Sequence, residues 1–154
     1  NYAGKPWLTQ YWTRQLIDSV YAGISPQKGY SGDEDQGLMG SLAVLLKIGL
    51  FSTDGGTSAK PFYEMTSPLF DKITIQLNSK YYPGKKVTIQ TKNNGPNNVY
   101  IQSTQMNGKS FNMPWIMHDD LIKGALLEIN MGATPNTKWG IETLNAPVST
   151  LQKK

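Results

Sequence analysis

The densest group of ionisable side chains in this sequence is Asp33, Glu34 and Asp35, which stand between glycines just before an apolar run. Two close carboxylates can hold one pKa high enough for acid–base work, and they can also bind a hard cation. In an extended segment Asp33 and Asp35 point to one side and Glu34 to the other, so the outer two could face one pocket. The alternative is an ordinary acidic first turn that stabilises the N-terminal end of a helix.

A second polar group, His118-Asp119-Asp120, could serve a metal or acid–base chemistry, but its acids also suit a capped turn before Leu121 and Ile122. We favour the capped turn. One histidine and no cysteine cannot complete a zinc site or form a disulfide. Serine-nucleophile and phosphate-loop motifs are absent, and no EF-hand spacing follows the acidic group.

The composition is that of a folded chain, with 38% hydrophobic and 17% charged residues in a total of 154. The net charge is +4, yet most basic residues stand singly in strand-like segments rather than in a stripe, so we expect no nucleic-acid surface. No apolar run reaches the ~18 residues of a membrane span. The chain has no signal peptide and begins at Asn1 without a methionine, which predicts a piece of a longer protein.

Helical periodicity dominates the first third of the chain. Residues 6–22 predict a helix with Pro6 in its first turn and apolar residues at three- and four-residue steps. This helix includes Trp7 and Trp12, which could stack on a sugar or simply pack. Residues 36–50 predict a second helix in which Lys47 is almost the only charge. A helix that is apolar nearly all round belongs inside a larger assembly of helices.

From about residue 60 the apolar period changes to two, which predicts strands. The alternating residues are Ile73, Ile75, Leu77, Val87, Ile89, Val99 and Ile101. Asn107-Gly108 predicts a hairpin, residues 118–123 a helical turn and residues 125–131 another strand. The expected fold class is therefore α+β, with an antiparallel, sandwich-like β-rich part at residues 59–140 after the helices of residues 1–58. Residues 141–154 predict a polar tail.

At this point the chain resembles the C-terminal portion of a glycoside hydrolase family 92 exo-α-mannosidase over roughly residues 1–140. The two most specific matches are Tyr2-Ala3-Gly4-Lys5-Pro6-Trp7-Leu8-Thr9-Gln10 and Gly32-Asp33-Glu34-Asp35-Gln36-Gly37-Leu38-Met39. The others are residues 48–51, 67–72, 98–103, 107–109, 131–132 and 139–140. One departure is Leu38-Met39-Gly40, where members of the family often have Gln-Met-Ser.

The resemblance implies calcium-dependent, inverting hydrolysis of terminal α-linked mannose, with α-1,2 as the expected linkage. It implies an (α/α)6 barrel, ending in the helices of residues 1–58, beside an N-terminal β-sandwich of the same polypeptide. By the same resemblance Asp35 is the general base and Asp33 helps to position the water. The family's general acid is a glutamate with no counterpart in this chain, so we expect the isolated chain to be inactive.

Other features implied by the resemblance concern the whole enzyme. The partner is a mannose-containing glycan such as an N-glycan, the location is the periplasm, the bacterial surface or the medium, and no calcium ligand is assigned to this chain. Two other interpretations stay open for the β-rich part. It could be a carbohydrate-binding module that uses aromatic residues such as Tyr100 and Trp115, or a purely structural brace, which we favour.

Overall fold

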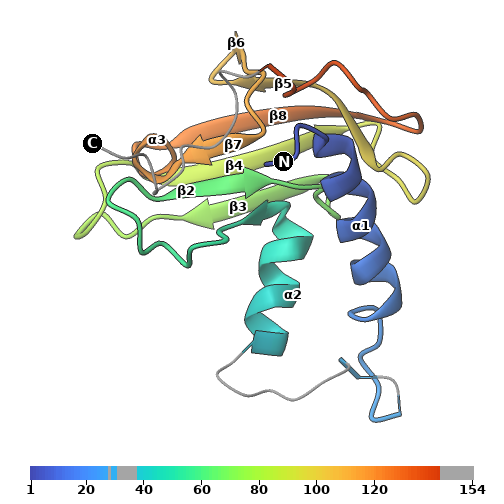
Figure 1. The fold of residues 1–154 in the computed structure, drawn as a ribbon. Helices are drawn as coiled ribbons and strands as arrows, with labels where there is room; N and C mark the ends of the chain where they lie inside the picture. Colours follow the sequence, from blue (N-terminus) through green and yellow to red (C-terminus); the bar gives the residue numbers. More distant parts are fainter. Residues whose placement is uncertain (28, 31–37, 143–154) are drawn as a thin grey trace.

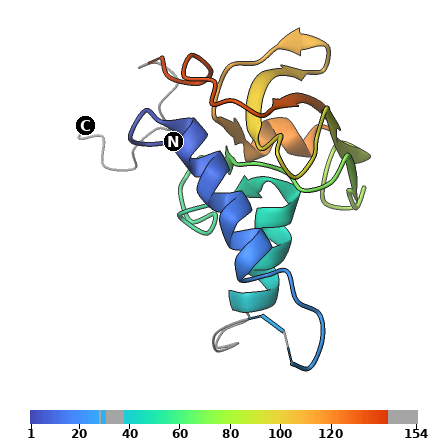
Figure 2. The same cartoon turned by 90° about the vertical axis from the view of Figure 1, so that its right-hand side faces the viewer.

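The computed structural model describes residues 1–27, 29–30 and 38–142 of the chain. Two helices come first, α1 (Pro6–Ser19) and α2 (Leu38–Ile48), and they extend together away from the strands (Figure 1, Figure 2). The elements that follow are β1 (Leu50–Phe51), β2 (Phe62–Met65), β3 (Lys72–Gln76), β4 (Lys86–Lys92), β5 (Tyr100–Met106), β6 (Lys109–Ser110), β7 (Trp115–Met117), α3 (His118–Ile122) and β8 (Ala125–Gly132). The expected α+β class is confirmed.

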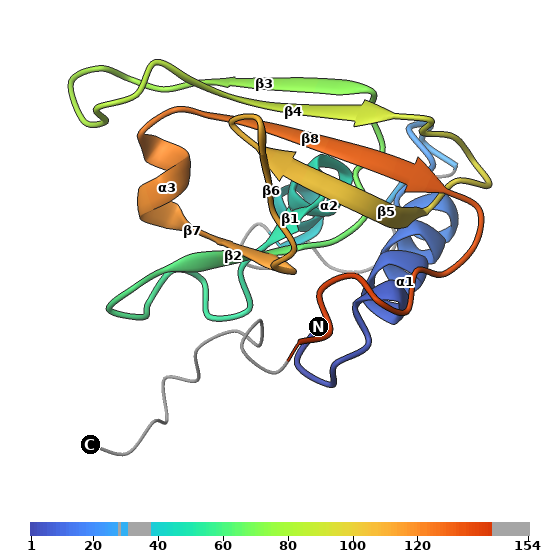
Figure 3. The same ribbon diagram turned by 90° about the horizontal axis from the view of Figure 1, so that it is seen from above.

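The strands form two sheets, one with the order β1-β2-β7 and one with the order β3-β4-β8-β5-β6. In Figure 3, β2 and β7 lie across from the strands of the larger sheet. All named pairs are antiparallel except β4 and β8, which run parallel with Val87 opposite Ala125. The expectation of a wholly antiparallel part is wrong at this pair. The reason is that β8 returns after a long connection and enters the sheet between β4 and β5.

The hairpin predicted at Asn107-Gly108 is confirmed as the turn between β5 and β6. Met106 pairs with Lys109, so the loop has two residues. Both carry a positive φ, 53° at Asn107 and 77° at Gly108. This is the backbone shape that a two-residue hairpin turn of type I′ requires, and asparagine followed by glycine adopts it at low cost.

The main core lies between the two sheets. Its buried residues are Leu50, Met65, Val87, Ile89, Ile101, Ile116, Leu121, Ala125, Leu127, Ile129, Met131 and Trp139. The central strand β8 alternates buried and more exposed side chains along its length, which is the pattern of a sheet with one covered face. Each large aliphatic side chain in this core contributes about 1.5–3 kcal/mol by leaving water. A smaller cluster around Ile17 and Leu46 joins the two helices.

Helix α1 docks on the β-rich part through polar side chains. Gln10 and Arg14 are only 1% and 2% exposed. Gln10 Oε1 accepts a hydrogen bond from the Ile101 amide at 2.9 Å. The Arg14 guanidinium donates to the Pro68 carbonyl at 2.6 Å and to the Gly95 carbonyl at 2.9 Å. Hydrogen bonds between buried side chains of α1 and backbone groups of the β-rich part thus fix the position of the helix.

The apolar stripe of α1 faces the other way. Leu8, Trp12 and Leu16, spaced four residues apart, are exposed, and Trp12 is 61% exposed. The helical periodicity predicted from the sequence is confirmed, although α1 ends at Ser19 rather than residue 22. Within the described residues no helix is long and apolar enough to cross a membrane. Residues 143–154 of the predicted tail lie outside the described part of the chain.

Candidate active site

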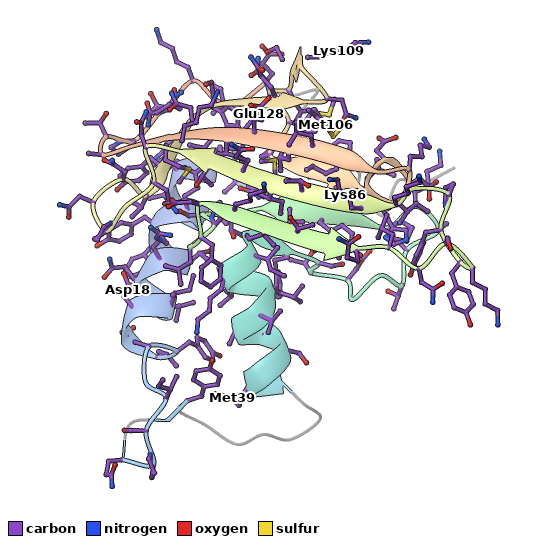
Figure 4. The ribbon with its side chains drawn as sticks, turned by 180° about the vertical axis from the view of Figure 1, so that it is seen from behind. Asp18, Met39, Lys86, Met106, Lys109 and Glu128 are labelled. Atoms are coloured by element: carbon purple, nitrogen blue, oxygen red, sulfur yellow. The ribbon has the colours of Figure 1, made fainter. Side chains whose placement is uncertain are left out.

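The predicted catalytic residues Asp33 and Asp35, with Glu34, belong to residues 31–37, which lie outside the described residues. The structure describes what flanks them. On one side α2 starts at Leu38, and Met39 in its first turn is buried (Figure 4). On the other side residues 20–27 and 29–30 follow α1. The described residues on both sides of the acidic group therefore lie at the ends of the two helices that point away from the sheets (Figure 1).

Lys47 of α2 holds the segment that precedes the acidic group. Its ammonium donates to the Tyr21 carbonyl at 3.0 Å and to the Tyr30 hydroxyl at 3.2 Å, and it lies 5.2 Å from the centre of the Tyr30 ring. The Tyr30 ring also meets the Tyr21 ring edge to face at 5.2 Å. Sequence reasoning missed this role. The signal available was a single lysine in an otherwise apolar helix.

A polar cavity of about 760 Å³ opens at the C-terminal end of α1 and along the segment that follows it. Its lining residues are Asp18, Ser19, Val20, Ala22, Gly23, Gln27, Gly29 and Tyr30. A volume of this size is that of an ordinary small-molecule site. The hydroxyl, amide and carboxylate groups around it can exchange hydrogen bonds with a ligand that carries several hydroxyl groups.

The second sequence candidate, His118-Asp119-Asp120, forms the start of the short helix α3. The predicted capping by an aspartate is wrong, because the N-cap is Met117 and no side chain bonds the helix start. His118 Nδ1 lies 3.2 Å from the Tyr63 hydroxyl, and Asp120 pairs with Lys123 at 3.1 Å. These are local structural contacts. No group of three or more His, Cys, Asp or Glu side chains able to hold a metal occurs among the described residues.

The two tryptophans of α1 lie in the part of the helix that is farther from the segment leading to the acidic group. Trp7 is half-buried, and the exposed Trp12 meets Tyr11 edge to face at 5.1 Å. Both belong to the first half of a 14-residue helix whose far end, Ser19, leads toward the acids. At 1.5 Å per residue, Trp12 is about 10 Å from that end along the helix axis. Both interpretations, packing and stacking on a sugar, therefore stay open for these two residues.

One buried carboxyl group was not predicted from the sequence. Glu64 on β2 is 5% exposed, and its Oε1 has no hydrogen-bond partner among the described residues. Burial raises the pKa of Glu64 above its ordinary value of 4.5, while a hydrogen bond with Thr53, the N-terminal charge and Asn1 oppose that rise. No sequence signal marks it, because a glutamate in a strand pattern usually points to solvent.

The same arrangement of helices and strands occurs in solved glycoside hydrolases. A family GH92 α-mannosidase from Bacteroides thetaiotaomicron aligns with a TM-score of 0.84 and 27% identity, covering 97% of this chain and 19% of that chain. A family GH92 inverting mannosidase from the same organism aligns with a TM-score of 0.81 and 33% identity, covering 96% and 19%. An uncharacterized secreted glycosidase of Arthroderma benhamiae is 31% identical over 153 residues, which are 97% of this chain and 18% of that protein.

These relatives are named as glycosidases or mannosidases, which indicates the class of protein to which the chain is related. Residues 1–133 match the glycosyl hydrolase family 92 catalytic domain, and the chain belongs to that family. The resemblance predicted from the sequence is confirmed. The chain spans less than a fifth of the length of these relatives.

Proposed function

We propose that this chain supplies the water-activating side of the active site of an α-mannosidase that removes terminal mannose from glycans. The observation that carries the proposal is the membership of residues 1–133 in the family 92 catalytic domain, with the acidic signature inside that range. The polar cavity at the end of α1, along the segment that precedes the signature in the sequence, supports it.

In the proposed reaction Asp35 takes a proton from the attacking water, and Asp33 orients that water. An inverting glycosidase places its two catalytic carboxyl groups roughly 6.5–9.5 Å apart, so that a water fits between the base and the sugar. The second group, a general acid that protonates the leaving oxygen, comes in this proposal from a glutamate elsewhere in the polypeptide. The isolated chain then lacks half of the chemistry and does not turn over substrate.

We propose calcium as a cofactor of the full-length enzyme, not of this chain by itself. Bound near the sugar, it would supply a positive charge that orients hydroxyl groups. Because the described residues contain no cluster of three His, Cys, Asp or Glu side chains, we assign it no ligand in this part of the chain.

The packing of α1 and α2 supports their placement in a larger ring of helices. Leu8, Trp12 and Leu16 on α1 and Val44 on α2 expose large apolar side chains that a soluble surface seldom groups along one helix. We propose that neighbouring helices of an (α/α)6 barrel cover them, with residues 1–58 as the end of the barrel. The β-rich residues 59–140 then serve as a brace, fixed to α1 through Arg14 and Gln10.

We further propose α-1,2-linked mannose, as in N-glycans, as the substrate. Export, to the periplasm, the cell surface or the medium, is proposed because the relative in Arthroderma benhamiae carries the name of a secreted glycosidase.

The test is Asp35→Asn in the full-length polypeptide, assayed with an aryl α-mannoside and an α-1,2-mannobiose. Loss of a general base should lower kcat on the order of 10²–10⁴-fold. Asp71→Asn, at an exposed aspartate just before β3, is the matched control and should keep wild-type rates. Proton NMR of the fresh product should show β-mannose first if the reaction inverts. Wild-type activity of Asp35→Asn would remove Asp35 from the mechanism, and α-mannose as first product would exclude inversion.

A further inference from the structure

A second cavity, of about 550 Å³, opens on the outer face of β2 and β7. Its lining residues are Asp54, Thr57, Ser58, Ala59, Lys60, Phe62, Trp115 and Met117. We propose that this cavity is an accessory binding site for a pyranose ring of a glycan, separate from the acidic group and without a catalytic role.

The floor of the cavity is aromatic. Phe62 pairs with Met117 across β2 and β7, and Trp115 is two residues before Met117 in β7 and on the same face as Met117. Phe62 is buried and meets the half-buried Trp115 edge to face, with ring centres 5.9 Å apart. The contact holds the indole in one orientation. A partly exposed, fixed indole offers the flat apolar surface against which the C–H face of a sugar ring can pack.

The wall of the cavity is a loop that its own hydrogen bonds hold in shape. Asp54 Oδ1 accepts from the Ser52 hydroxyl and from the Gly56 amide, both at 2.9 Å. The Thr57 hydroxyl donates to the Asp54 carbonyl at 2.8 Å. Nearby Ser58, with the Gly56 amide and the Ser52 hydroxyl, keeps the pKa of Asp54 below its ordinary value of 3.8, so the carboxylate is charged at neutral pH and accepts the hydrogen bonds from Ser52 and Gly56. A wall formed before the ligand arrives lowers the entropy cost of binding.

The side chains around the opening, which form its rim, determine which kind of ligand the cavity can bind. Thr57 and Lys60 are exposed and Ser58 is half-buried, so hydroxyl groups and one ammonium group border the opening. Hydroxyl groups both donate and accept hydrogen bonds, whereas an ammonium group donates only. One carboxylate and one ammonium line the cavity together, which gives it no strong preference for a charged ligand. An apolar floor with such a rim suits a neutral ring that carries several hydroxyl groups.

The cavity is remote from Leu38, the first described residue after the acidic group. The acidic group directly precedes α2, whereas the loop that walls the cavity follows α2 after the short strand β1. Leu38 and the last residue of α2, Ile48, are the two ends of an 11-residue helix, which is about 16 Å long. The accessory site therefore does not depend on the catalytic assignment, and the two can fail separately.

The test is affinity electrophoresis of the full-length polypeptide in cold native gels that contain soluble α-mannan, xylan or hydroxyethyl cellulose. We expect retardation in at least one gel and about tenfold weaker binding in Trp115→Ala, since removal of an aromatic contact costs on the order of 1 kcal/mol or more. The combined variant Thr57→Ala/Lys60→Ala, at exposed positions, should weaken binding by a similar factor. Tyr81→Ala, at an exposed tyrosine outside the cavity, should bind like the wild type.

Activity on a small aryl α-mannoside is measured on the same preparations and should stay unchanged in all these variants. Absence of retardation in all three gels would overturn the accessory site without touching the proposed function. Equal retardation of the wild type and the rim variant would also overturn it. If Trp115→Ala unfolds, the rim variant alone decides between these outcomes.

Discussion

Replacement of Arg14 by methionine should destabilise the protein by about 2–4 kcal/mol. Arg14 is the sole arginine in the sequence, is 2% exposed, and is bound by two carbonyl groups and by Asn94 Oδ1 at 3.2 Å. Hydrogen bonds to a charged group contribute about 1.5–3 kcal/mol each. Part of their sum is offset by the cost of burying the cation, which amounts to several kcal/mol. Burial lowers the pKa of Arg14, and Asp18 opposes this only in part.

The assay is thermal unfolding followed by circular dichroism, with urea unfolding as a second measurement. A loss of 2–4 kcal/mol corresponds to a Tm lower by about 5–15 °C in a chain of this size. Arg14→Lys should recover only part of the loss, because an ammonium group cannot span acceptors that the planar guanidinium reaches together. Gln15→Ala, at the exposed neighbouring position, is the control. A Tm for Arg14→Met equal to that of the control would refute the conclusion that the hydrogen bonds of Arg14 stabilise the packing of α1 against the β-rich part.

Two further predictions concern Glu64 and Lys47. Because burial raises the pKa of Glu64 in the folded state, its carboxyl group lowers stability as pH rises through that pKa and has no such effect below its unfolded value of 4.5. Glu64→Gln should therefore have a higher Tm than the wild type at pH 7, and this difference should vanish near pH 4. A Tm difference that is the same at both pH values would contradict the raised pKa of Glu64. Lys47→Met should free the segment around Tyr21 and Tyr30, at a cost of about 1–2 kcal/mol, since two hydrogen bonds are lost. Hydrogen exchange should then accelerate at residues 20–30 but not in β8. Unchanged exchange at residues 20–30 would refute the conclusion that Lys47 stabilises this segment.

The sequence alone determined the features that depend on neighbouring residues. The 3.6-residue period located α1 and α2, the two-residue period located most of the strands, and Asn107-Gly108 fixed one hairpin because few residues adopt positive φ readily. The acidic signature and its flanking segments were sufficient to identify the family, which the match over residues 1–133 confirmed. These features can be predicted from the sequence because each depends on neighbouring residues and not on the segments that pack against them.

Only the tertiary structure decided which surfaces meet. Periodicity shows that α1 has apolar residues at helical spacing, but the described structure buries Ile17 together with the polar side chains Gln10 and Arg14 and leaves Trp12 exposed. The parallel pairing of β4 with β8 and the burial of Glu64 likewise depend on partners distant in the sequence. Contacts of this kind follow from the summed packing of many residues, and no local pattern encodes them.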